Sequence, residues 1–323
     1  MIEIEIKKNE AGQRLDKYLR KLLPNATNGF IYKMLRKKNF KLNNQKAEGS
    51  EITRLNDKLQ LYISDETYEK FACLKKDNRI DFKNKYPSKQ FEIIFEDENC
   101  LIINKPAGIL SQKSNRNDIS ANEYLIGYLL ETGKLSLDEM NTFHPSVVNR
   151  LDRNTSGILV FGKTLKGIQE YSECFRDRHC KKYYLALVSG EVKTEKNVKG
   201  YLYKNEKDNK VVISDSSYYN DEKGSAIETE FSPVELFEGY TLLKVHLITG
   251  KTHQIRAQLS TLGHPIVGDA KYGGGRFVTH SGERMKVERQ MLHAHKLEMD
   301  DGNTYIAGIP EDMKSILNFC RGR

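Results

Sequence analysis

One carboxylate in this 323-residue chain stands in a setting that suits catalysis. Asp152 lies between Arg150 and Arg153 in residues 147–164, which read VVNRLDRNTSGILVFGKT. The Asn-Thr-Ser-Gly run after it is rich in turn formers, and the apolar run that follows is typical of a buried strand. The pattern therefore predicts that Asp152 lies in a tight loop directly before a core strand.

The charges beside Asp152 suggest what this loop does. An opposite charge nearby favours the ionised form of a carboxylate, which is the form that acts as a nucleophile or a general base. The alternative is a capped loop with a surface ion pair, and an Asp that merely stood between two Arg residues would favour that reading. The longer sequence block around Asp152 decides between the two.

That block, RLDRxTSGxLVxxKT, resembles the catalytic loop of the RluA-type pseudouridine synthases, which modify uridines in ribosomal and transfer RNA. The resemblance implies that Asp152 is the catalytic residue. Many family members have His before the first Arg of this block, where this chain has Asn149. The resemblance covers nearly the whole chain, because NKPAG, KxYxA, TGKTHQIR and GHPxxGD also occur in the family's order.

The KxYxA and TGKTHQIR motifs supply two further site residues. The family pattern implies that Tyr184 lies by the catalytic aspartate and stacks on the target base, and that Arg256 pairs with Asp152. A planar guanidinium can bind a carboxylate through two parallel hydrogen bonds, and we expect this bidentate geometry between Arg256 and Asp152. Thr252 can cap a helix over 253–262, which places His253 and Arg256 on one face.

Local patterns predict the elements that carry these motifs. Alternating strands are expected at 91–95, 101–103, 182–188 and 242–248. Ser120 and Glu123 form a capping box for one helix, and a second helix is expected to begin after Thr164. The stretch KYYLALV puts Tyr184 on one face of its strand and Tyr183 on the other.

Two features that suggest a ligand are better explained without one. His293 and His295 share a strand face, but no nearby Asp, Glu or Cys completes a set of metal ligands. The glycines at 273–275 lack the strand–helix frame of a nucleotide loop, so we expect a flexible surface loop there. We therefore expect neither a metal nor an organic cofactor.

The positive charge of the chain is concentrated at its N-terminal end. The formal net charge is +8, and residues 1–63 hold 14 Lys and Arg against 7 Asp and Glu, which accounts for +7. This segment predicts two helices and short strands, an order that resembles the small RNA-binding fold of ribosomal protein S-four. Lys and Arg contacts to phosphate would give affinity with little sequence choice. The expected RNA-binding residues are Arg14, Lys17, Lys33, Arg36, Lys37, Lys38 and Lys41 here, and Arg150, Arg153 and His253 in the body.

Together these observations predict an α+β protein of two domains. Residues 1–64 form a small α/β RNA-binding module, 65–89 a linker, and 90–323 a pseudouridine synthase domain with a mostly antiparallel mixed central sheet flanked by helices and loops. Five cysteines without a CxxC pair suggest free thiols, and no apolar run is long enough to span a bilayer. We expect a cytoplasmic monomer.

The sequence thus predicts an RNA pseudouridine synthase that acts on large-subunit ribosomal RNA, with transfer RNA as the alternative substrate. The carboxylate could attack the anomeric carbon or remove a sugar proton, and the sequence does not separate these. A competing class is a non-catalytic RNA-binding factor in ribosome assembly, which the intact set of Asp152, Tyr184 and Arg256 argues against. A hydrolytic glycosidase would normally need a second carboxylate.

Overall fold

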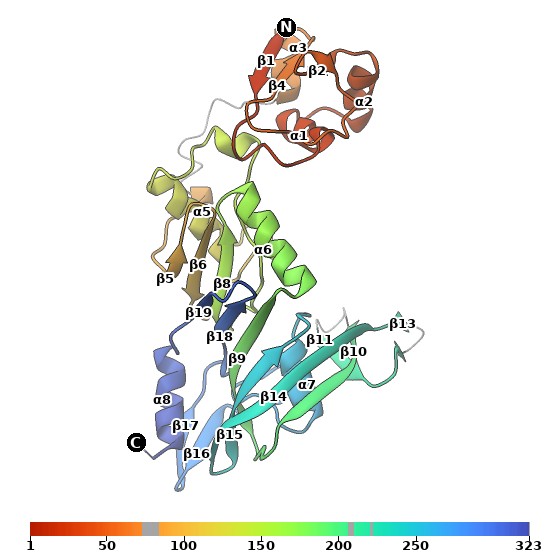
Figure 1. Cartoon of the computed structure of the whole chain (residues 1–323). Helices are drawn as coiled ribbons and strands as arrows, with labels where there is room; N and C mark the ends of the chain where they lie inside the picture. The colour runs from red at the N-terminus through yellow and green to blue at the C-terminus, as the bar shows by residue number, and fades with distance from the viewer. Residues whose placement is uncertain (73–83, 206–209, 220–221, 323) are drawn as a thin grey trace.

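The computed structural model describes residues 1–72, 84–205, 210–219 and 222–322. Figure 1 shows an elongated molecule, with a small N-terminal sheet at one end and a large sheet running through the rest. No helix within the described ranges is long and apolar enough to cross a membrane. The four cysteines that lie within these ranges, Cys100, Cys174, Cys180 and Cys320, are free thiols.

The N-terminal sheet has four antiparallel strands with two helices packed against it. Its strand order is β1 (Ile2–Glu5), β4 (Lys58–Leu61), β2 (Phe40–Leu42) and β3 (Gln45–Lys46). Helices α1 (Leu15–Leu22) and α2 (Asn28–Arg36) lie where the apolar spacing predicts them. Thr27 caps α2 by accepting a hydrogen bond from the Phe30 amide. Leu15, Leu19 and Leu35 are buried in a core that is separate from those of the body.

The expected linker contains a helix that belongs to this core. Helix α3 (Asp65–Ala72) follows β4 closely, and Ala72 is buried while Tyr68 and Phe71 pack against the N-terminal cluster. The prediction that 65–72 is a connector was therefore wrong. The mixed charges of this segment conceal the helix, because it begins with polar residues and has few apolar ones. Residues 73–83 of the expected linker lie outside the described residues.

The body is built on an eleven-stranded sheet, which confirms the mixed, mostly antiparallel architecture. The strands β8 (Ser156–Gly162) and β18 (Leu292–Met299) pair in parallel. The other described strand pairs are antiparallel. Short strands β7 (Ser146–Val147) and β19 (Thr304–Ile306) pair with β8 and β18. The main path runs β11 (Lys210–Ser214), β10 (Lys196–Asn205), β14 (Ser225–Phe237), β15 (Tyr240–Leu247), β9 (Cys180–Ser189), β18 (Leu292–Met299), β8 (Ser156–Gly162), β6 (Cys100–Lys105) and β5 (Glu92–Glu96).

The parallel contact between β8 and β18 joins the two halves of this sheet. Gly157 pairs with Ala294 at a φ of 114°, and a Cβ at Gly157 would lie 2.2 Å from the Ala294 carbonyl oxygen. Only glycine permits so close an approach. Beside it His293 is fully buried and makes hydrogen-bonding contacts through Nδ1 with Ser156 Oγ at 2.9 Å and through Nε2 with the Ala307 carbonyl at 3.2 Å. Both ring nitrogens of His293 are thus engaged within the protein.

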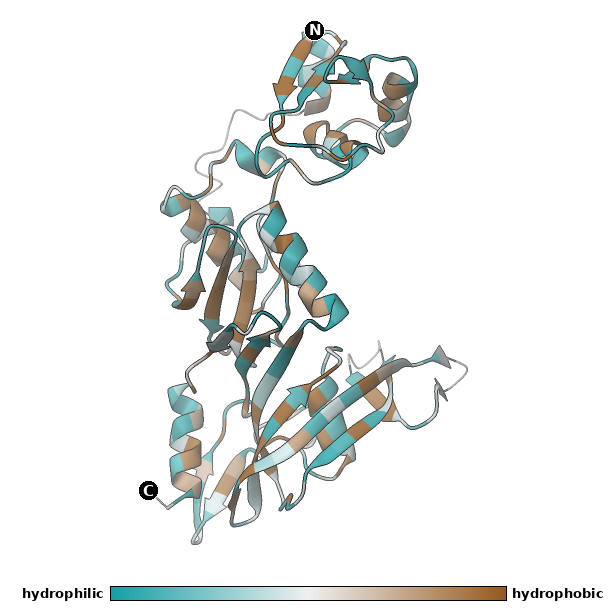
Figure 2. Cartoon of the chain, in the orientation of Figure 1, coloured by the Kyte–Doolittle hydropathy of each residue, from teal (hydrophilic) through white to brown (hydrophobic). Residues whose placement is uncertain are grey.

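Helices cover the sheet at several points. Helix α5 (Ala121–Glu131) has the predicted capping box of Ser120 and Glu123, and Thr164 caps α6 (Leu165–Asp177). Helix α7 (Gln254–Thr261) packs near β11, and α8 (Glu311–Cys320) lies by the hairpin of β16 (Phe277–His280) and β17 (Glu283–Lys286). In Figure 2 the strands β6 and β8 are brown over most of their length, as expected for the buried centre of a sheet.

The glycine-rich turn at 273–275 differs in part from the expected flexible surface loop. Gly274 is buried, and its amide donates to the Asp269 carbonyl at 2.8 Å. A Cβ there would lie 1.8 Å from the Ile266 carbonyl oxygen. Gly273 and Gly275 are exposed, so the turn lies at the surface as predicted, but Gly274 packs tightly against residues 266–269.

Candidate active site

The loop that carries Asp152 is fixed at several points before it enters β8. Asn149 donates from Nδ2 to the Ile158 carbonyl at 3.1 Å and accepts from the Val160 amide at 2.8 Å. Its side chain therefore ties the loop to the backbone of β8. Asn149, which replaces the His of many family members, thus has a structural role here.

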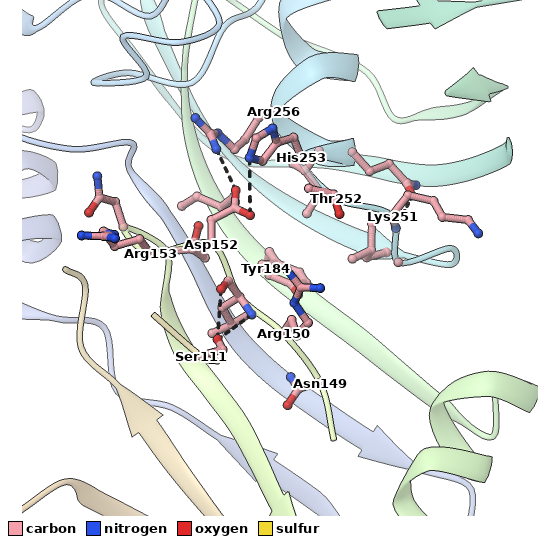
Figure 3. Close-up of a pocket in the computed structure, with 18 of the residues that line it drawn as sticks. Ser111, Asn149, Arg150, Asp152, Arg153, Tyr184, Lys251, Thr252, His253 and Arg256 are labelled. Atoms are coloured by element: carbon pink, nitrogen blue, oxygen red, sulfur yellow. Dashed lines mark hydrogen bonds and ion pairs between the residues drawn. The ribbon is translucent and has the colours of Figure 1, made fainter. Parts of the chain in front are cut away.

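Ser111 fixes the residue directly before Asp152. The Ser111 hydroxyl donates to the Leu151 carbonyl and accepts from the Leu151 amide, both at 3.0 Å. On the other side, the Thr155 amide donates to the Asp152 carbonyl at 3.0 Å and closes a tight turn. The backbone of Asp152 is therefore constrained from both directions (Figure 3).

The NKPAG motif holds the far side of the same loop through a buried lysine. Lys105 is fully buried, and its ammonium group donates to the carbonyls of Pro106, Ile109 and Arg153 at 2.8–3.2 Å. Burial, together with the nearby charge of Arg289, lowers the pKa of Lys105 to about 7. Lys105 therefore acts on the site by positioning the chain on either side of it, without reaching the cavity.

The charge partner of Asp152 comes from helix α7. Arg256 Nη1 donates to Asp152 Oδ2 at 2.7 Å, as the sequence predicted for this pair. Among the described residues, neither Arg150 nor Arg153 forms an ion pair with Asp152. In Figure 3 both flanking arginines extend away from the carboxylate. The arginine that pairs with Asp152 is therefore Arg256 and neither of its two neighbours in the chain.

The bidentate partner of Arg256 is Asp269. The described residues Arg256 and Asp152 do not form the bidentate bond that was expected. Arg256 Nε and Nη2 donate to the two Asp269 oxygens at 2.6 and 2.8 Å. Asp269 is 1% exposed, whereas the Asp152 side chain is 24% exposed. Asp269 also accepts from the amides of Lys271 and Tyr272. Both carboxylates raise the pKa of Arg256 against the opposing effect of burial, so it stays charged.

His253 begins α7 in an unusual conformation that points its ring at the site. It is the N-cap residue, with a φ of 57°, and it takes the place in which Thr252 was expected. A left-handed conformation is costly for a residue with a Cβ and is frequent at functional sites. His253 Nε2 lies 3.9 Å from Asp152 Oδ1. Burial lowers the pKa of His253, which favours the neutral imidazole.

Tyr272 sets the orientation of this imidazole. Its hydroxyl lies 3.0 Å from His253 Nδ1 and accepts from the Val211 amide at 3.0 Å. These two contacts hold the imidazole through Nδ1 and leave Nε2 on the side of the ring that faces Asp152. The Tyr272 ring also lies 5.1 Å from the guanidinium carbon of Arg256. Tyr272 thereby contacts both residues that face Asp152.

Asp152, Tyr184 and Arg256 line one cavity of about 710 Å³. Tyr184, on β9, is buried, and both burial and the Asp152 charge raise the pKa of its phenol. The phenol is therefore protonated at neutral pH. Arg150, Lys251 and Lys271 supply positive charge around the same opening. The structure thus brings together the three expected catalytic residues with His253, Arg150 and Arg153.

The other expected RNA-binding residues lie in the N-terminal module. Lys17, Lys33, Arg36, Lys37 and Lys38 are exposed, and Lys41 Nζ lies 4.8 Å from the centre of the Tyr62 ring. The Arg14 guanidinium is partly engaged within the protein, because it pairs with the buried carboxylate of Asp16 at 3.0 Å. The cavity that contains Asp152 is lined by described residues of the body.

Ser111, Lys105, Asp269 and Tyr272 were not predicted as site residues. The sequence carried a signal for two of them, since Lys105 belongs to NKPAG and Asp269 ends GHPIVGD. Ser111 and Tyr272 stand in no such motif. Among the described residues, no three His, Cys, Asp or Glu side chains are grouped as metal ligands.

The mixed sheet and this arrangement of an Asp, a buried Tyr and a helical Arg agree with the protein family that the sequence matches. The family model described as RNA pseudouridylate synthase matches residues 99–261. This chain belongs to the RNA pseudouridylate synthase family. It is an isomerase that converts uridine in RNA to pseudouridine.

Relatives match this chain over most of its length. The ribosomal large subunit pseudouridine synthase C of Vibrio parahaemolyticus is 32% identical over 91% of this chain and 87% of its own length. The protein of the same name from Pasteurella multocida is 32% identical, covering 98% and 93%. An uncharacterised RNA pseudouridine synthase of Mycoplasma genitalium is 28% identical, covering 90% and 87%.

Solved structures share the fold. Human RNA pseudouridylate synthase domain containing 4 superimposes with a TM-score of 0.55 at 20% identity, covering 71% of this chain and 93% of that chain. Human RNA pseudouridylate synthase domain containing 1 gives a TM-score of 0.50 at 21% identity, covering 72% and 96%. The mixed sheet is therefore the fold of a pseudouridine synthase.

Proposed function

We propose that this enzyme isomerises specific uridines of large-subunit ribosomal RNA, with Asp152 as its catalytic carboxylate. The choice of RNA rests on relatives named ribosomal large subunit pseudouridine synthase C, which match over about nine-tenths of the chain. In this proposal Tyr184 stacks on the target base, and Arg256 holds Asp152. The N-terminal module anchors RNA through phosphates, and the enzyme works in the cytoplasm.

The observation that carries the assignment is the asymmetric environment of the Asp152 carboxylate. Oδ2 accepts from Arg256 Nη1 at 2.7 Å, while Oδ1 faces the cavity with His253 Nε2 3.9 Å away. A distance of 3.9 Å is too long for a hydrogen bond, so Oδ1 is the oxygen that can act on a substrate. Arg256 orients the carboxylate through Oδ2 and leaves the other oxygen free to react.

The reaction requires the base to enter this cavity and to turn within it. A uridine leaves the RNA stack at a cost of a few kcal/mol, which stacking and edge contacts in the pocket recover. Asp152 Oδ1 then acts at the ribose, by attack on the anomeric carbon or by removal of a sugar proton. The N-glycosidic bond breaks, the detached uracil turns, and its carbon five forms a bond to the anomeric carbon. The bond between Asp152 and the sugar breaks in this step if one had formed, or the sugar regains its proton if one had been removed. Carbon five then loses its proton and N1 gains one, so the reaction is an isomerisation.

Tyr184 acts in its protonated form in this scheme. Burial and the nearby Asp152 charge both raise the pKa of its phenol, so a phenolate base is disfavoured at neutral pH. The aromatic face supplies a stacking surface for uracil, which needs no change of charge. His253 Nε2 faces the reacting carboxylate, which suits it to contact the ribose or the adjoining phosphate.

Asp152→Asn tests the assignment, because the amide keeps the shape of the side chain and removes its charge. Tritium release from rRNA transcripts labelled at uracil carbon five should fall below about one thousandth of the wild-type rate. The dissociation constant for the same RNA should stay within about threefold of the wild-type value. Tritium release at the wild-type rate would end the assignment of Asp152 as the catalytic residue.

The identity of the RNA is tested separately. Pseudouridines in total RNA from cells with and without the gene should differ at positions of the large-subunit ribosomal RNA. A difference confined to transfer RNA would replace the proposed substrate and leave the mechanism in place.

A further inference from the structure

A second cavity, of about 320 Å³, lies beside the cavity that contains Asp152 and shares part of its wall. Lys251, Thr252 and His253, the residues that lead into α7, line both. The rest of its lining comes from β10, β11, β13 (Glu222–Lys223) and the start of β14. We call this second cavity the lysine groove and define it by Lys204, Lys210, Lys223 and Lys251.

The lysine groove gathers positive charge in one place. Its described lining contains those four lysines and no carboxylate. Across the part of the chain that the structure describes, the ammonium groups of Lys210, Lys223 and Lys251 make no hydrogen bond or ion pair, whereas many surface lysines do, such as Lys286 with Glu288. Gathering like charges around one cavity weakens the folded state by repulsion. The arrangement is therefore better explained by an anionic ligand than by stability.

The groove is tied firmly to the catalytic helix. Leu202 of β10 and Val211 of β11 form a small apolar cluster with Ala257 of α7, against which Tyr272 packs. The Val211 amide also donates to the Tyr272 hydroxyl, which contacts His253. These contacts fix the lysines relative to Arg256 and Asp152. A ligand in the groove is thus held at a set position from the reacting ribose.

We propose that the lysine groove binds the phosphodiester backbone of the RNA nucleotides that adjoin the flipped uridine. This inference rests on the proposed function, since it assumes that a uridine of RNA occupies the neighbouring cavity. A flipped nucleotide stays joined to both neighbours, so its flanking phosphates must leave along a wall of that cavity. Lysines act as point charges for phosphate, and such contacts position a strand without reading its sequence.

The experiment compares Lys210→Gln/Lys223→Gln with the matched control Lys286→Gln/Lys314→Gln in the full-length chain. Lys286 and Lys314 are exposed on β17 and α8, which Figure 1 shows at the opposite end of the body from β10 and β11. The probe is a large-subunit rRNA transcript, and binding is measured from 50 to 200 mM KCl. Each pair is also made in the Asp152→Asn background, so that affinity is read without turnover.

The groove variant should bind about tenfold more weakly at the lowest salt. Its slope of log affinity against log salt should fall by about 1.4–1.8, because two phosphate contacts are lost. The rate at saturating RNA should fall less than the affinity does, and the control should show the wild-type slope. A groove variant whose slope equals that of the control would overturn the proposal, whether or not its affinity changes.

Uncharged phosphate analogues in the RNA locate the contact between the lysine groove and the RNA backbone. They also separate this proposal from the proposed rRNA substrate. Once the modified uridine is mapped, methylphosphonates placed one at a time on either side of it in a short oligonucleotide should weaken wild-type binding at one flank. The same substitutions should have little further effect on the groove variant. If the wild-type enzyme forms no pseudouridine in rRNA, the proposed substrate fails. The salt slope still decides whether the groove binds an RNA backbone.

Discussion

The guanidinium of Arg256 serves two carboxylates at once. Its fork geometry matches Asp269 through Nε and Nη2, and the remaining Nη1 reaches Asp152. Asp269 is almost completely buried, so this ion pair is strongly desolvated and depends on good geometry. Asp269 thereby fixes the plane of the guanidinium, and the plane in turn fixes where Asp152 Oδ2 is held.

Arg256 variants should separate positioning from charge. Arg256→Ala leaves Asp269 buried without its partner, so we expect a destabilisation of roughly 3–5 kcal/mol together with a loss of activity. Arg256→Lys retains a positive charge but cannot bind both carboxylates in fixed directions. It should unfold at a urea concentration nearer the wild-type midpoint and still release tritium at least about tenfold more slowly at saturating RNA.

The matched comparison for this prediction is Arg321, which forms a bidentate pair with Glu235 and does not belong to the described lining of the Asp152 cavity. Arg321→Lys should reduce the maximal rate less than Arg256→Lys does. If Arg256→Lys were fully active, the two-carboxylate geometry would not matter for catalysis.

At the scale of elements, the parallel junction of β8 and β18 depends on a neutral histidine. Burial, together with the nearby His295 and Arg289, lowers the pKa of His293 to about 4. The unfolded chain binds a proton at His293 near pH 6.5, whereas the folded chain does so only near pH 4. The stability that this residue contributes is therefore complete above pH 6.5 and is lost as the pH falls toward 4.

This titration predicts a loss of about 3 kcal/mol of unfolding free energy between pH 6.5 and 4 from His293 alone. His293→Gln should be less stable at pH 7, because it disturbs the contacts with Ser156 and Ala307. Its stability should nevertheless depend less on pH than that of the wild type. Urea unfolding at pH 7.0, 5.5 and 4.5 measures both effects. His179→Gln, at an exposed histidine, is the control, and equal pH dependence in wild type and His293→Gln would contradict the prediction.

At the scale of the whole molecule, the basic N-terminal module is docked against the body through a few polar contacts. Thr142 Oγ1 donates to the buried Glu10 carboxylate at 2.6 Å, and Gln169 donates to the Gly12 carbonyl at 3.0 Å. These bonds join the module to the body near α6.

Neutralising the exposed face of α2 should weaken binding more than chemistry. Lys33→Gln/Arg36→Gln/Lys37→Gln removes three exposed charges while Asp152, Tyr184 and Arg256 stay in place. The slope of log affinity against log salt should fall by up to about 2.1–2.7, and the maximal rate should fall less than the affinity. Steady-state kinetics on transcribed rRNA at two salt concentrations give both quantities.

The control for this triple variant is Lys193→Gln/Lys286→Gln/Lys314→Gln, which removes the same charge from other exposed sites. Unchanged affinity and slope in the α2 variant would mean that the module binds something other than RNA, such as a ribosomal protein. The body alone would then select the uridine.

Features that depend on neighbours in the chain could be read from the sequence. The capping box of Ser120 and Glu123, the Thr27 and Thr164 caps and the apolar stripes of α1 and α2 each involve residues within one or two turns. The same holds for the placement of Asp152 in a tight loop before β8, because turn formers and a buried run adjoin it. Strands β10 and β14 have no counterpart among the expected elements, since their pairing depends on distant partners.

The sequence by itself therefore determined which residues meet in the cavity, through motifs that name Asp152, Tyr184 and Arg256. Only the tertiary structure decided how they meet. Asp152 lies 104 residues from Arg256, so its charge partner depends on the angle between α7 and the loop before β8. The turn that follows α7 brings Asp269 against Arg256 and gives the guanidinium its bidentate bond, which local charge patterns could not reveal. Side-chain partners across such separations are set by the packing of whole elements, because each guanidinium can satisfy only the carboxylates that packing brings within reach.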